Sequence, residues 1–171
     1  MISASIHAHL IVRSLSFALF SLLLAACSTV TLISDYDEPT DQALTSIQQS
    51  SDDFITKLIA AARSEKNAFD KHKQFYDDAD QQLRRLEFRV TSIPKNSHTV
   101  KLVADIRAVL LGDGKCSAEG SSLKDLHCNP EALATGPSKM ALQLAQKNIN
   151  QTIGAALALE LAKKQGLEKN K

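Results

Sequence analysis

Residues 40–93 read TDQALTSIQQSSDDFITKLIAAARSEKNAFDKHKQFYDDADQQLRRLEFRVTSI and contain neither glycine nor proline. Gln, Lys, Ala, Leu and Asp are abundant in this segment, so helix is expected over nearly its whole length. Apolar side chains recur at alternating steps of three and four residues, which predicts one buried helix face that packs on another helix. This row consists of Ile55, Leu58, Ala62, Phe69, Tyr76, Ala79, Leu83, Leu86, Val90 and Ile93. The expected fold class is therefore all-α.

These residues can form either one long helix or a hairpin. The apolar row keeps its phase through the middle, which permits a single helix of about 52 residues, roughly 80 Å long. Residues 63–67, RSEKN, are five polar residues in succession and favour a turn. Because helices of ordinary length are much commoner, we expect two helices, at 40–63 and 67–93, with the single helix as the alternative.

A third helix is expected C-terminal to this hairpin. Pro94 ends the preceding helix, since proline cannot continue its hydrogen bonding. Asn96 or Ser97 can cap a helix at 97–111, and Gly112 suits the left-handed conformation that commonly follows a helix end.

The rest of the chain predicts a long connection and a last helix. Residues 115–137 are rich in Gly, Ser and Pro and are expected to be irregular, with a single helical turn at 129–133. The last helix is expected at 138–164. Its buried side is expected to consist of Met140, Leu144, Ile149, Ile153, Ala156, Leu157 and Leu161. Residues 38–171 thus predict a helical domain, a small up-and-down bundle of about four helices.

The chain begins with a leader-like segment. Arg13 is the only basic residue among residues 1–26, and residues 14–26 are dominated by Leu, Phe and Ala. This order is typical of the basic and apolar regions of a signal peptide. The apolar run is shorter than the roughly 20 residues that a membrane-spanning helix needs.

Residues 24–27, LAAC, resemble the lipobox of bacterial lipoproteins. The resemblance implies that residues 1–26 are removed and that Cys27 carries a diacylglyceryl thioether, with a further acyl chain such as palmitate on its amine. The residue after Cys27 is Ser28 and not aspartate. In the sorting pattern of lipoproteins, this implies delivery to the outer membrane of a Gram-negative cell, facing the periplasm. Residues 27–37 would form a short tether. The alternative is an ordinary secretory signal that releases a soluble periplasmic protein.

With Cys27 taken by lipid, Cys116 and Cys128 are the remaining two cysteines of an exported protein. We expect them to form a disulfide that pins the long connection. His127 beside Cys128 suggests zinc binding with Cys116 as the alternative, but adjacent ligands point apart and a fourth ligand is not evident.

The composition argues against nucleic-acid binding, and the sequence lacks the common catalytic motifs. Lys and Arg total 20 against 19 Asp and Glu, and removal of Arg13 with the leader leaves 19 of each. A neutral chain lacks the excess of cations that nucleic-acid binding needs. His72, His98 and His127 are scattered, and no nucleophile, phosphate-loop, zinc-protease or haem motif occurs. We predict no catalytic residue, no cofactor and no metal site, and expect His72 to be a structural or interface residue.

The function expected from these features is that of a non-enzymatic envelope lipoprotein, anchored to the membrane through Cys27, with a structural role or an unknown envelope protein as partner. Secretin pilotins are similar in architecture alone: some are small four-helix lipoproteins with a disulfide, and they bind a partner helix in a groove. A pilotin-like secretion accessory is therefore one alternative. The other is a carrier of a small molecule or lipid, in which the apolar side of the last helix lines a cavity.

Overall fold

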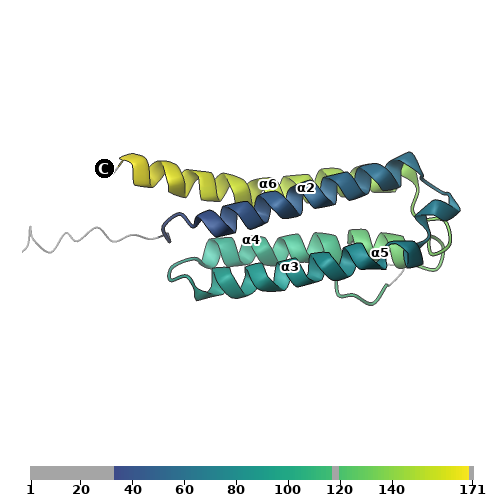
Figure 1. Cartoon of the computed structure of the whole chain (residues 1–171), viewed down its shortest axis with the longest axis horizontal. Coiled ribbons are helices and arrows are strands. Elements are labelled where there is room, and N and C mark those ends of the chain that lie inside the picture. Colours follow the sequence, from purple (N-terminus) through teal and green to yellow (C-terminus); the bar gives the residue numbers. More distant parts are fainter. Residues whose placement is uncertain (1–32, 117–119, 170–171) are drawn as a thin grey trace, which may run out of the picture. The chain divides into compact units, whose positions relative to one another are not determined.

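Four long helices run up and down in chain order in the computed structural model, which describes residues 33–116 and 120–169 (Figure 1). Within these residues every regular element is helical, which confirms the all-α bundle predicted from sequence. The predicted leader, residues 1–26, and Cys27 lie outside the described residues. The elements are α2 (Glu38–Ala60), η1 (Glu65–Asn67), η2 (Phe69–Lys71), α3 (Lys73–Ser92), α4 (Ser97–Leu111), α5 (Leu123–Cys128) and α6 (Lys139–Lys169).

Helix α2 begins with an acidic cap. The carboxylate of Asp37 accepts hydrogen bonds from the backbone N–H of Thr40 at 3.1 Å and from its hydroxyl at 2.6 Å. Pro39 occupies the first turn, where its lack of an N–H costs nothing. Glu38 places negative charge at the positive end of the helix dipole.

The connection between α2 and α3 confirms the hairpin and shows that the single long helix is wrong. Arg63 adopts a positive φ of 55°, which an α-helix does not permit. The buried amide of Asn67 donates to the carbonyl of Leu58 at 2.6 Å and so satisfies one of the last carbonyls of α2. The second helix begins at Lys73, six residues later than predicted, because η1 and η2 occupy residues 65–71.

Helix α6 buries the predicted positions Ile149, Ile153 and Ala156, with Leu157 partly buried against the core, but not the predicted positions nearer its ends. Met140, Leu144 and Leu161 are 80%, 69% and 54% exposed, so these three predictions were wrong. The buried row is Leu142, Ala145, Ile149, Ile153 and Ala156. The two sets differ because α6 carries apolar residues on overlapping faces, and the row in phase with Ile149 and Ile153 passes through position 142. The helix also continues to Lys169, beyond the predicted end at 164.

The long connection is more ordered than predicted. Ser122 accepts a hydrogen bond from the N–H of Asp125 at 3.0 Å and starts α5, where irregular chain was expected. The turn expected at 129–133 is present, with the N–H of Ala132 bonded to the carbonyl of Asn129 at 3.1 Å. α5 lies against α4, as Figure 1 shows at the right of the bundle.

Gly112, directly after α4, is a position at which any side chain should be costly. Its φ is +59° with ψ −145°, a region essentially restricted to glycine. A Cβ there would lie 2.7 Å from the Ser122 hydroxyl and closer still to the Asp125 carboxylate. We expect Gly112→Ala to lower the free energy of unfolding by about 1–3 kcal/mol, measured by urea denaturation.

Gly114 provides the control for this prediction. Its φ is also positive, at +75°, but nothing lies within 4 Å of a Cβ built there. Gly114→Ala should therefore cost less than Gly112→Ala. Equal losses in the two variants would show that backbone strain alone matters and that the close packing of α4 on the Ser122 region does not.

Candidate interaction surface

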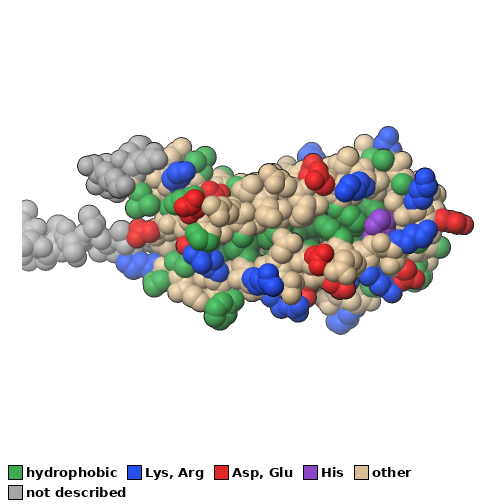
Figure 2. All heavy atoms as spheres, in the orientation of Figure 1, with side chains coloured by type: hydrophobic (Ala, Val, Ile, Leu, Met, Phe, Trp, Pro, Cys, Tyr) green, Lys and Arg blue, Asp and Glu red, His purple; other side chains and the backbone are tan. Residues whose placement is uncertain are grey.

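An apolar groove opens between α2 and α3. These two helices make the least extensive contact among the four neighbouring pairs of long helices in the bundle. The groove has a volume of about 320 Å³, with the nearly buried side chains of Ile47 and Leu86 among its lining residues. Figure 2 shows hydrophobic side chains gathered along the middle of this face, between the two helices. The full lining is Ala43, Ser46, Ile47, Gln82, Arg85, Leu86 and Arg89.

Two arginines of α3 line this groove, and they differ in their partners. Arg89 donates to both carboxylate oxygens of Asp37, from Nε and Nη2, at 2.7 Å each. These bonds, with those from Thr40, lower the pKa of Asp37 to about 2. Arg85 is exposed and forms no ion pair with any residue of the described ranges. Its charge is therefore available to a bound partner.

Phe88 is exposed on α3 but is not among the residues that line the groove. It follows Arg85 by three residues, a spacing that makes two side chains neighbours on a helix. Its side chain is 79% exposed, which is unusual for phenylalanine. The groove alone is therefore the surface that we consider as a candidate binding site.

A second, larger hollow between α2 and α6 is polar. Its volume is about 460 Å³, and Asp52 and Asn150 are among its lining residues. The Asp52 carboxylate accepts hydrogen bonds from the amides of Gln146 at 2.8 Å and Asn150 at 3.0 Å. Two of its polar lining side chains, those of Asp52 and Asn150, thus bind each other.

Cys116 and Cys128 form the predicted disulfide, with their Cα atoms 5.3 Å apart. The bond joins the segment after α4 to the end of α5. Both sulfurs are therefore engaged, and His127 points elsewhere: it is fully buried among Tyr76, Phe54 and Phe69. The zinc alternative that used these cysteines with His127 is wrong for this geometry.

The hydrogen bonds of His127 determine which tautomer its neutral ring adopts. Nε2 lies 2.6 Å from the carbonyl oxygen of Asn67, which can only accept, so Nε2 carries the proton. Nδ1 then accepts from the hydroxyl of Tyr76 at 2.8 Å. Burial lowers the pKa of His127, because the imidazolium would lose its hydration. His72 is half-buried, as expected of a structural residue, with Nε2 3.0 Å from the Lys66 carbonyl.

Stability should fall in mild acid because of His127. Its pKa is lower in the folded state than in the unfolded chain, so its contribution is present above the unfolded value of about 6.5 and is lost as pH falls below it. The slope from this one residue can approach about 1.4 kcal/mol per pH unit. We expect His127→Gln to remove this part of the pH dependence in urea titrations between about pH 7 and 5.

His98→Gln is the matched control, since His98 is exposed on α4. This variant should keep the wild-type pH dependence. A His127→Gln variant whose stability changes with pH as steeply as the wild type would rule out His127 as the source.

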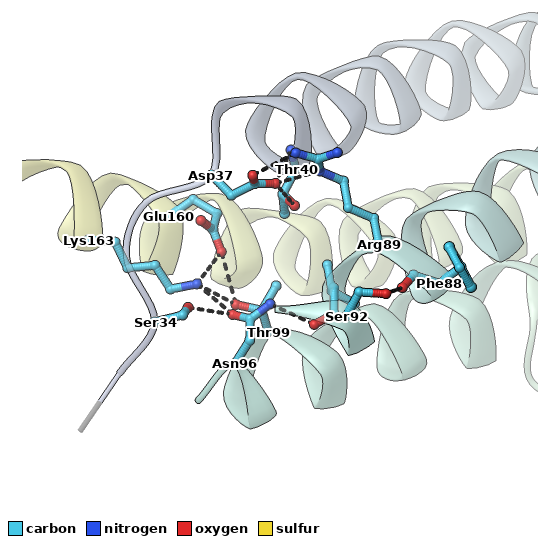
Figure 3. A network of polar contacts seen from close by, with 11 residues as sticks. Ser34, Asp37, Thr40, Phe88, Arg89, Ser92, Asn96, Thr99, Glu160 and Lys163 are labelled. Atoms are coloured by element: carbon cyan, nitrogen blue, oxygen red, sulfur yellow. Dashed lines mark hydrogen bonds and ion pairs between the residues drawn. The ribbon is translucent and has the colours of Figure 1, made fainter. Parts of the chain in front are cut away.

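A buried charged network lies at the end of the bundle where the described chain begins (Figure 3). Glu160 is fully buried, and its Oε1 lies 2.7 Å from the ammonium of Lys163, which is only 4% exposed. The same ammonium donates to Asn96 Oδ1 and Thr99 Oγ1, each at 2.8 Å. The Thr99 hydroxyl donates to Glu160 at 2.9 Å. All three ammonium protons thus have acceptors.

Asn96 extends this network to two other segments. Its Oδ1 accepts from the hydroxyl of Ser34 at 2.8 Å, and its Nδ2 donates to the carbonyl of Val90 at 3.0 Å. Asn96 precedes α4, as predicted, but its side chain does not cap that helix. The network therefore joins the chain before α2 to α3, α4 and α6.

The sequence did not predict the groove, the role of Arg85 in it, or the burial of Glu160. A signal existed for Glu160, because it continues the row of Ile153 and Ala156 at helical spacing. None existed for the groove, which depends on how far apart two helices pack.

The described ranges also lack some features that would suggest other sites. They contain no group of three His, Cys, Asp or Glu side chains placed to hold a metal ion. In the same ranges, every helix falls short of the length and apolarity that crossing a membrane requires. Comparison of the chain with known protein families, with curated proteins and with solved structures finds no match.

Proposed function

We propose that the protein is a non-enzymatic envelope lipoprotein, anchored in the outer membrane through lipid on Cys27, that binds another envelope protein in the groove between α2 and α3. The LAAC sequence at 24–27 supports the anchor. The observation that carries the binding role is the groove itself, which has an apolar lining and an arginine without an ionic partner among the described residues.

An amphipathic helix is the occupant that fits this groove best. The groove lies between two helices, with Ala43, Ile47 and Leu86 lining it. A helix that presents apolar side chains at steps of three and four residues can fill such a surface. A carboxylate on that helix would pair with Arg85. A pilotin-like secretion accessory is the more specific form of this role.

In-cell photo-crosslinking tests the binding role. A photoreactive phenylalanine analogue placed at Gln82, which lines the groove, should give a discrete protein adduct in cells that produce the full-length chain. The same analogue at Met140, which is 80% exposed in the first turn of α6, should not give that adduct. Equal adducts from both positions, or none from Gln82, would contradict a binding site in the groove.

Charge reversal sharpens the test. Arg85→Glu should reduce the Gln82 adduct, because it would repel the proposed carboxylate. Arg84→Glu makes the same change in charge one residue away, outside the groove, and breaks only an exposed ion pair with Asp80. If both reversals reduce the adduct equally, the effect is general electrostatics and Arg85 is not part of the site.

A carrier of a small molecule or lipid would have to use the same groove. Its volume of about 320 Å³ lies at the lower end of the range of small-molecule sites. The apolar face of α6, which the carrier alternative places around a cavity, is instead packed in the core, where Leu142, Ile149 and Ile153 are at most 1% exposed. Native mass spectrometry of the purified protein would detect a retained ligand and so favour this second role.

A further inference from the structure

The chain enters the bundle at a fixed point. The N–H of Ser34 donates to the carbonyl of Lys95 at 3.1 Å, and its hydroxyl donates to Asn96 Oδ1 at 2.8 Å. Asn96 is held in turn by the ammonium of Lys163 (Figure 3). We call this end of the bundle the tether end; it comprises residues 33–37, the turn at 93–96 and residues 160–167.

The connection to Cys27 is short. Only residues 28–32 separate Cys27 from Ile33, so the two Cα atoms can be at most about 20 Å apart. Helix α2, with 23 residues, is about 35 Å long. A lipid on Cys27 therefore restrains the tether end, and not the opposite end, to lie near the bilayer.

The tether end carries exposed aliphatic side chains. Ile33, Leu161 and Leu167 are 44%, 54% and 39% exposed. Figure 1 shows the last turns of α6 extending past the start of α2. Lys164 of α6 lies beside the segment that precedes α2, because its ammonium is 5.5 Å from the centroid of the Tyr36 ring. Leu167 lies almost one turn further on along α6.

We propose that the tether end is a membrane-contact surface, in which Leu167 and Ile33 enter the lipid interface while the opposite end points away from the bilayer. Aliphatic side chains next to an exposed lysine such as Lys164 suit this region, because a lysine stem can lie along the apolar surface while its ammonium group remains at the water side of the interface. This inference rests on the proposed lipid on Cys27. It leaves the groove between α2 and α3 along the side of an upright bundle, open to a partner.

Tryptophan fluorescence tests this orientation cleanly, because the chain contains no tryptophan. The full, lipidated protein would carry Leu167→Trp or, as the matched control at the far end, Met140→Trp. Each variant would be reconstituted into phosphatidylethanolamine and phosphatidylglycerol vesicles with or without bromine on the acyl chains. We expect brominated lipid to quench Leu167→Trp and its emission to shift to shorter wavelength, with Met140→Trp unchanged. Leu161→Trp, on the exposed surface of α6, is the second probe should Leu167→Trp disturb the helix end.

Flotation of the vesicles distinguishes a failure of the proposed lipid anchor from a failure of the proposed membrane contact. Protein that does not float with the vesicles would overturn the lipid anchor and, with it, this inference. Protein that floats while both tether-end probes remain unquenched would overturn the membrane contact alone. Equal quenching of the tether-end and Met140 probes would likewise overturn the upright orientation.

Discussion

Replacement of Lys163 by methionine is expected to lower the free energy of unfolding by about 3–5 kcal/mol, because it would leave the carboxylate of Glu160 buried without a counter-charge. Glu160 is fully buried, and Lys163 supplies the cation that its Oε1 contacts. Its other oxygen, Oε2, has no hydrogen-bond partner among the described residues, so little else offsets the cost of burial. Urea denaturation of the purified protein measures the loss.

A double variant distinguishes an unpaired charge from lost packing. Lys163→Met combined with Glu160→Leu should recover most of the stability, because apolar side chains of similar size can replace a buried ion pair at little cost. Lys164→Met, which removes the neighbouring exposed lysine, should change stability little. The account of the network would be contradicted if Lys163→Met were no more destabilising than Lys164→Met.

Loss of the disulfide is the second change with a large expected effect. Cys116→Ser with Cys128→Ser should lower the free energy of unfolding by about 3 kcal/mol, the loop-entropy value for a closed loop of 13 residues. Cys128 is also the last residue of α5, beside the buried His127. Loss of the bond should therefore loosen the packing of this ring on Tyr76 as well.

Chemical reduction provides an independent measurement of the same bond. Dithiothreitol should lower the urea midpoint of the wild-type protein toward that of the double serine variant. The reductant should leave the variant itself unchanged, because it has no bond between these positions to reduce. A wild-type midpoint that stays the same after verified reduction would show that this bond contributes nothing to stability.

The sequence predicted those parts of the fold that depend on local patterns. The three-and-four spacing from Ile55 to Val90 placed the core face of α2 and α3 correctly, since buried side chains occupy nearly every position of that row. The glycine after α4 and the disulfide followed from residue types at defined positions. Such features are determined by nearby residues and do not depend on how the rest of the chain packs.

Features that depend on packing between distant segments were not predictable. α6 has apolar residues around much of its circumference, so the sequence could not decide between the face of Leu144 and the face of Leu142. Glu160 would ordinarily be assigned to the surface. It is buried because Thr99 and Lys163 meet it there, and Thr99 is 61 positions away in sequence. α5 was missed since six residues are too few for a periodic signal, although Ser122 and Asp125 have helix-start spacing.

The groove illustrates the same limit. Ala43 and Ile47 lie one turn apart on α2, and Leu86 lies on α3, so their spacing resembles that of any buried helix pair. Only the separation of the two helices leaves a groove over these side chains, of which Ile47 and Leu86 are each 2% exposed. Arg85 and Arg89 look equivalent in sequence, yet Asp37 pairs with Arg89 alone.

The intact mass of the protein extracted from the membranes of cells that produce it tests the central claim most directly. Residues 24–27 and the short connection to Ser34 lead us to expect a chain that begins at Cys27 and carries diacylglycerol on its sulfur with an acyl chain on its amine. A mass equal to residues 27–171 plus these lipids would agree with a lipid-anchored bundle. A mass without lipid, whether of the whole chain or of a chain cleaved by an ordinary signal peptidase, would contradict it.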